Sequence, residues 1–203
     1  MVERWLRRDN GKHHLRPEHK QRCMAHLAAW LWRKGQRSIQ ADELEPWFHE
    51  FLESQPDLRR RYVGISPDKL EEDLRTATFL VRIDTDDSSQ FRFAHTSMQE
   101  FFLAQYLLNA LQQGRREAWA MPVVSAETLV FLGQSLQDIG APSDILQTLS
   151  VWRAPYLAQA SELWLRYSLM AHARGLPTPT LAGCDLSGAQ LHGFGSGRPW
   201  PAA

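Results

Sequence analysis

The sequence is poor in cysteine, in long apolar runs and in net charge, and each shortage excludes a class of protein. Two cysteines, Cys23 and Cys184, stand among 203 residues, so we expect no disulfide framework and a reducing, cytoplasmic location. Uninterrupted apolar runs fall far short of the ~20 residues that a membrane-spanning helix needs. Basic and acidic residues both total 23, so no overall field draws the chain to DNA or an anionic membrane. Residues 1–9 are charged where a secretion signal is apolar, so export is not expected.

Motifs for common catalytic chemistries are also missing. A phosphate loop requires glycine, four residues, and then Gly-Lys-Ser/Thr. The Gly11-Lys12 pair is followed by His13, and Leu6 stands where the first glycine is needed. No Gly-x-Ser-x-Gly elbow marks a nucleophile. We therefore expect this chain to be non-enzymatic.

The sequence does contain apolar residues at the spacing that is typical of amphipathic helices. Apolar side chains at helical spacing predict a helix from Pro17 to Gly35 and a second over residues 41–54. Ser66-Pro67-Asp68 is a start signal for a third helix that reaches about Phe79. The intervening Arg59-Arg60-Arg61 is interpreted as a loop, either solvated or in contact with phosphate or an acidic partner.

The period then changes from helical to alternating. Residues 80–83 and 91–94 alternate around a polar stretch, which predicts a two-stranded hairpin with a loop over 84–90. A long helix follows His95, with Thr96/Gln99 and Ser97/Glu100 as alternative capping pairs. Three helices followed by a hairpin predict a winged-helix module over residues 17–113.

The remainder is predicted to be a helical array over 114–176, with helices at about 126–139, 143–149 and 154–173. Residues 177–203 begin with three five-residue units, each with a central leucine and a final glycine, which predict one coil of a β-solenoid and then a poorly ordered tail. Residues 1–16 are interpreted as the tail of a preceding helical region. The expected fold is therefore mainly α, with a winged-helix module and β-hairpin wing, an α-helical array and a short solenoid start.

Residues 93–104, FAHTSMQEFFLA, resemble the winged-helix signature of NACHT-type signalling ATPases, which include NOD-like receptors and bacterial antiviral relatives. Residues 5–9 and the Leu27-Ala28 pair resemble upstream segments of that family, and the terminal units resemble the pentapeptide repeats of some bacterial members. The resemblance extends over residues 1–193. It implies that His95 contacts the β-phosphate of ADP on a nucleotide domain in cis or in trans.

In that family, nucleotide exchange frees the winged helix and permits oligomer assembly. Because this chain lacks the phosphate loop, the resemblance implies the regulatory and partner-sensing portion of such an ATPase, with ADP or ATP held elsewhere. The ligand that it senses is not indicated by the sequence.

Other interpretations of the same residues remain open. His95 could instead satisfy a helix terminus within the module. The chain could be a winged-helix DNA-binding regulator, although the third helix carries four acidic residues against two basic ones, which disfavours groove insertion: Asp68, Glu71, Glu72 and Asp73 against Lys69 and Arg75. It could also be a protein-interaction scaffold with no link to a nucleotide.

Two groups invite a metal, and neither is expected to hold one. His19, Cys23 and His26 share a helical face, but no fourth zinc ligand is apparent. The acidic loop around Asp84 departs from the calcium-binding pattern, since Ser89 stands where glycine is required.

Overall fold

The computed structural model describes residues 14–65, 69, 72–73, 79–84, 89–140, 145 and 158–179, with side chains of the last range from residue 163 onward. The described chain is mainly helical with a three-stranded antiparallel sheet, which confirms the expected fold class at this level. It divides into two compact units between Phe102 and Leu103, inside the helix α6 (Thr96–Gln112).

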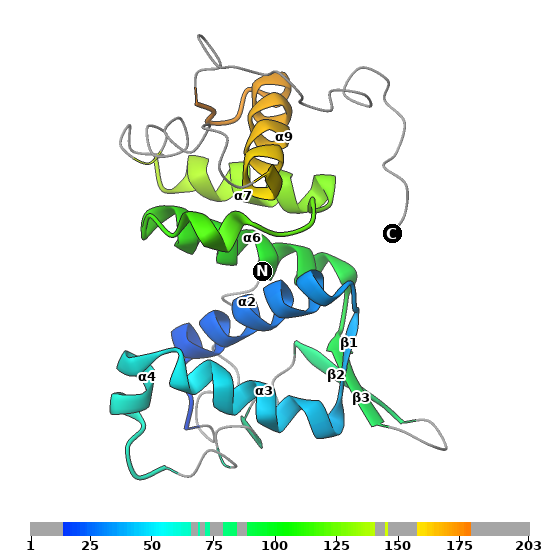
Figure 1. Cartoon of the computed structure of the whole chain (residues 1–203), viewed down its shortest axis with the longest axis vertical. Helices are drawn as coiled ribbons and strands as arrows, with labels where there is room; N and C mark the ends of the chain where they lie inside the picture. Colours follow the sequence, from blue (N-terminus) through cyan, green and yellow to red (C-terminus); the bar gives the residue numbers. More distant parts are fainter. Residues whose placement is uncertain are drawn as a thin grey trace. The chain divides into compact units, whose positions relative to one another are not determined.

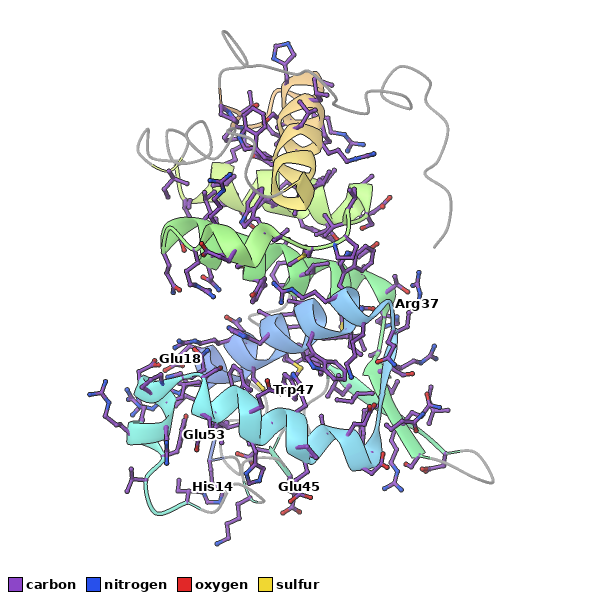
Figure 2. All side chains as sticks on the ribbon, in the orientation of Figure 1. His14, Glu18, Arg37, Glu45, Trp47 and Glu53 are labelled. Carbon is purple, nitrogen blue, oxygen red and sulfur yellow. The ribbon has the colours of Figure 1, made fainter. Side chains whose placement is uncertain are left out.

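The first two described helices of the first unit form where the apolar spacing predicts them (Figure 1). Helix α2 (Pro17–Lys34) starts with its proline in the first turn and ends at Gly35, whose φ of 66° is the left-handed conformation that glycine adopts without strain. Helix α3 (Ala41–Glu53) buries the stripe that includes Leu44 and Phe48. Figure 2 shows Trp47 on the side of α3 that faces α2.

The sheet contains one strand that the sequence analysis did not predict. Strands β2 (Leu80–Asp84) and β3 (Ser89–Phe93) form the expected hairpin, with a shorter connection than the predicted 84–90 loop. Strand β1 (Ser38–Gln40) pairs with the other edge of β3, so the order is β1-β3-β2. A three-residue strand is too short to show alternation, and it exists because β3 lies beside it.

Of two further predictions for this unit, one is wrong and the other falls mostly outside the described residues. Arg59–Arg61 do not form a loop, because they are the last turn of the short helix α4 (Pro56–Arg61). Pro56 at its first position and Asp57 in its first turn are helix-start signals, but only Leu58 is buried, so no apolar period was visible. Most of the predicted third helix lies outside the described residues: Lys69, Glu72 and Asp73 are helical, and Phe79 lies in a turn.

Aromatic side chains join the sheet to the start of α6. Phe102 is 1% exposed, and its ring centroid lies 5.2 Å from that of Phe79 and 5.8 Å from that of Phe93. Edge-to-face and tilted pairs at this spacing add to the stabilisation from burial. These contacts attach the first two turns of α6 to the sheet.

The second unit contains the rest of α6, the 3₁₀ turn η1 (Arg116–Trp119), α7 (Ala126–Asp138) and α9 (Ala158–Arg174). The fully buried Trp119 donates its indole N–H to the carbonyl of Leu107, at 3.1 Å, and so fastens η1 to α6. Helix α7 confirms the prediction for 126–139, and Ser125 caps it by accepting the N–H of Thr128.

The chain folds back along α9 after that helix ends. Leu176 donates its N–H to the carbonyl of Ala171, at 2.9 Å, and the Tyr167 hydroxyl donates to the carbonyl of Pro177. Helix α9 matches the described part of the helix expected over 154–173, and residues 154–157 lie outside the described residues. The predicted 143–149 helix lies outside the described residues except for helical Ile145. The five-residue units lie outside them from residue 180 onward, so the solenoid stays a prediction.

Candidate functional site

His95 lies between the end of β3 and the start of α6, and its side chain is exposed. The carbonyl of His95 accepts the N–H groups of Met98, at 3.0 Å, and Gln99, at 3.4 Å. His95 therefore occupies the N-cap position itself, one residue before the earlier of the two predicted capping pairs. The preceding Ala94 is held in place because its N–H donates to the Phe79 carbonyl, at 2.9 Å.

The surroundings of His95 determine what it can do chemically. As the first residues of a 17-residue helix, Thr96 and Ser97 carry backbone N–H groups with no intrahelical acceptor. The positive end of the helix dipole lies at the same place. Gln99 is 6% exposed and Glu100 is half-buried, whereas His95 is exposed, as are Thr96 and Ser97. An exposed imidazole at a helix N-terminus can donate a hydrogen bond to an anion.

The two groups considered for metals hold other roles. The ring of His19 contacts Tyr62, and Cys23 is 1% exposed, with burial raising the pKa of its thiol well above the usual value. A protonated thiol is a poor zinc ligand. Asp84 accepts from Ser89 and Arg82, and these hydrogen bonds lower its pKa. Among the described residues no group of three or more His, Cys, Asp or Glu is placed to hold a metal ion.

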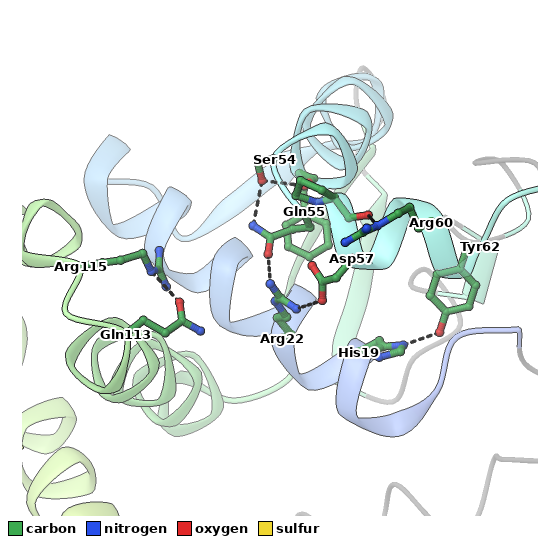
Figure 3. Close-up of polar contacts among 11 residues, drawn as sticks. His19, Arg22, Ser54, Gln55, Asp57, Arg60, Tyr62, Gln113 and Arg115 are labelled. Carbon is green, nitrogen blue, oxygen red and sulfur yellow. Dashed lines mark hydrogen bonds and ion pairs between the residues drawn. The ribbon is translucent and has the colours of Figure 1, made fainter.

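A polar network between α2 and α4 was not identified from the sequence (Figure 3). Arg22 of α2 forms an ion pair with Asp57, with Nη1 2.6 Å from Oδ2, and also donates to Gln55. One turn earlier, His19 Nδ1 lies 2.6 Å from the hydroxyl of Tyr62, the C-cap residue of α4. The start signal at Pro56 could have revealed α4, but no local signal pairs its residues with α2.

The arginine cluster on α4 is partly neutralised. Arg59 Nη1 lies 2.6 Å from Glu53 Oε2 in an exposed ion pair. Arg60 donates its Nε–H to the Pro56 carbonyl of its own helix. Exposed pairs of this kind contribute little to stability. The cluster therefore forms the exposed, charged end of a helix, and its contact with phosphate or an acidic partner stays a prediction.

Comparisons of the chain with protein-family models, curated proteins and solved structures found no match. Of the helices that the structure describes, none combines the length and the apolarity that a bilayer crossing requires. The function of this chain is therefore inferred from its geometry and from the family resemblance of residues 93–104.

Proposed function

We propose that this chain is the non-catalytic regulatory and partner-sensing portion of a NACHT-type signalling ATPase. Residues 17–113 would dock on a nucleotide domain, in cis or in trans, with His95 in contact with the ADP phosphates. The observation that carries the proposal is the exposed imidazole at the N-terminus of α6, directly after the last strand of the sheet.

The order of elements supports a winged-helix module. Helix, strand and helix (α2, β1, α3) are followed by the short helix α4, by helical residues at 69, 72 and 73, and then by the β2–β3 hairpin and α6. The sheet order β1-β3-β2 places the hairpin strands together and the short first strand on the far side of β3. In this arrangement the hairpin would be the wing, and His95 would follow its second strand.

The proposed contact has a simple physical basis. A phosphate at the start of α6 would meet the imidazole N–H together with the N–H groups of Thr96 and Ser97, which have no acceptor within the helix. ADP would supply the negative charge, and this chain would supply donors and the helix dipole. Release of the nucleotide would remove that charge and weaken the docking, which links nucleotide state to exposure of the module and to oligomer assembly.

The test is the rate of ADP release from an assembly that contains this chain and its nucleotide domain. His95→Ala should accelerate release roughly 10- to 100-fold, the range expected for one hydrogen bond to a charged group. His172→Ala is the matched control, because His172 is an exposed histidine in the last turn of α9. Unchanged release in the His95 variant would remove the phosphate-contact proposal.

DNA binding is the alternative from another class, and one observation bears on it. Asp73, counted above among the acids that disfavour groove insertion, is 6% exposed and accepts the N–H of Leu15 at 2.7 Å. The Asp73 carboxylate is therefore buried and would not face DNA, so three of the four acidic residues still disfavour insertion of this helix into a groove. Salt-sensitive binding of duplex DNA by the full chain would favour this alternative, whereas no binding at low salt would leave the NACHT proposal or the scaffold interpretation.

A further inference from the structure

Strand β2 lies at one edge of the sheet, and no strand among the described residues pairs with its outer side. Its five residues pair with β3 in an unbroken register, from Leu80 opposite Phe93 to Asp84 opposite Ser89. The strand has neither a proline nor a bulge, which are two of the devices that keep edge strands from pairing with other chains. The backbone of β2 can therefore accept a further strand.

The hydrogen bond between Ala94 and Phe79 shows which backbone groups of β2 point outward. Ala94 donates its N–H to the Phe79 carbonyl, at 2.9 Å, and these two residues continue the register of β2 with β3. In an antiparallel pair, positions that exchange hydrogen bonds alternate with positions that do not. The odd-numbered residues of β2 therefore bond to β3, whereas the N–H and C=O groups of Arg82 and Asp84 point away from it.

The side chains along this edge are exposed and carry opposite charges. Arg82 Nε lies 2.8 Å from Asp84 Oδ1, and the two side chains are 59% and 64% exposed. Because they are two positions apart, they share one face of the sheet. On the other face Val81 is 36% exposed and Ile83 is half-buried. Charges on an edge strand oppose pairing with a like-charged strand, but a basic and an acidic residue two positions apart can be matched by the same two residues of a second copy.

The charges select one register for two copies of β2. An antiparallel pair centred on Ile83 places Arg82 of each copy opposite Asp84 of the other, and the outward backbone groups of these residues then bond across a two-fold axis. Centring the pair on Arg82 would place two guanidinium groups opposite each other, which is destabilising. Centring it on Val81 would place Leu80 opposite Arg82 and leave the guanidinium without a matching charge.

We propose that β2 is a self-association surface, on which a second copy of this chain pairs edge to edge and extends the antiparallel sheet. The register is centred on Ile83 and is stabilised by reciprocal contacts between Arg82 of one copy and Asp84 of the other. Because the interface is small, the association is weak, and salt weakens it further by screening the exposed charges. The pairing requires no nucleotide, and it is independent of the contact proposed for His95.

Charge reversal combined with mixing tests this surface. Sedimentation of the full chain at concentrations from about 10 µM to about 1 mM, where small interfaces associate, should show a reversible dimer. Arg82→Asp and Asp84→Arg should each weaken self-association roughly 10-fold, because like charges then lie opposite each other. An equal mixture of the two variants should restore association, since a strand with two acidic residues then meets a strand with two basic ones.

A second exposed ion pair in the same unit supplies the matched control. Arg59 Nη1 lies 2.6 Å from Glu53 Oε2, and the two side chains are 64% and 63% exposed. Arg59→Asp and Glu53→Arg make the same changes of charge away from β2. Self-association should therefore be unchanged in each control variant and in their mixture.

Amide hydrogen exchange identifies the strand that pairs. Protection at Arg82 and Asp84 should rise with protein concentration, because their N–H groups point outward. Protection at Val81 and Ile83 should stay constant, since their N–H groups already bond to β3. A chain that stays monomeric at the highest concentration would overturn the proposal. So would association without added protection at Arg82 and Asp84, or a mixture of the two charge-reversal variants that associates no better than either alone.

Discussion

Gly133 is the residue whose substitution gives the sharpest test of packing in the second unit. It is buried in the middle of α7, where glycine is an unfavourable helix residue. A Cβ built there would lie 2.7 Å from Cδ1, 3.3 Å from Cβ and 3.4 Å from Cγ of Leu176. Cδ1 is too close and Cβ is closer than usual, whereas Cγ is at ordinary contact distance, so moving the tip of the leucine alone would not relieve the contact completely.

Two opposing free-energy terms decide the outcome of Gly133→Ala. Helix propensity favours alanine by about 1 kcal/mol. Overpacking costs about 1–3 kcal/mol, and we expect it to be resisted because the backbone of Leu176 is tied to Ala171 while the next carbonyl accepts the Tyr167 hydroxyl. The variant should therefore be less stable than the unmodified chain by about 1 kcal/mol.

A double-mutant cycle measured by urea unfolding isolates the clash. In a Leu176→Ala background the closest atom, Cδ1, is gone and Cβ is the one tight neighbour that remains among the three, so Gly133→Ala should become neutral or stabilising by up to about 1 kcal/mol. The coupling between the two sites should be about 1–3 kcal/mol. If Gly133→Ala stabilises the unmodified chain as much as it stabilises the Leu176→Ala chain, the close approach of α7 to this segment is refuted.

Two further predictions follow from the pKa directions. The pKa of the Asp57 carboxyl should lie below 3.8 because Arg22 donates a hydrogen bond to it, and Arg22→Met should return the pKa measured by NMR toward 3.8. The stabilisation that this ion pair gives to the fold is present above pH 3.8 and is lost as the pH falls through the folded-state pKa. Cys23 should react with a thiol reagent only as fast as the fold opens, because burial keeps its thiol protonated and covered. In a Cys184→Ser chain, labelling should therefore accelerate steeply only near the urea unfolding transition, and fast labelling in native buffer would contradict the burial of Cys23.

The place of His95 in the fold could be predicted from the sequence, whereas the surroundings of its side chain could not. The alternation that ends before His95 and the amphipathic run after it indicate a strand-to-helix junction, and the structure places the residue there with its side chain exposed. The predicted capping pairs were one residue or more too late, because side chains that can cap a helix are also tolerated in its first turn. Whether this imidazole contacts a phosphate stays a prediction.

Helices α2 and α3 can be predicted from local signals, which are Pro17 and Gly35 at the ends of α2 and the apolar spacing of α3. Contacts between distant parts of the chain establish that Ser38–Gln40 is a strand and that the Tyr62 hydroxyl accepts the Arg16 N–H at the start of α2. The difference lies in the range of these interactions. Capping and helical period act between neighbours in the chain, whereas β1 needs the edge of β3, and Tyr62 needs a histidine that stands 43 residues before it.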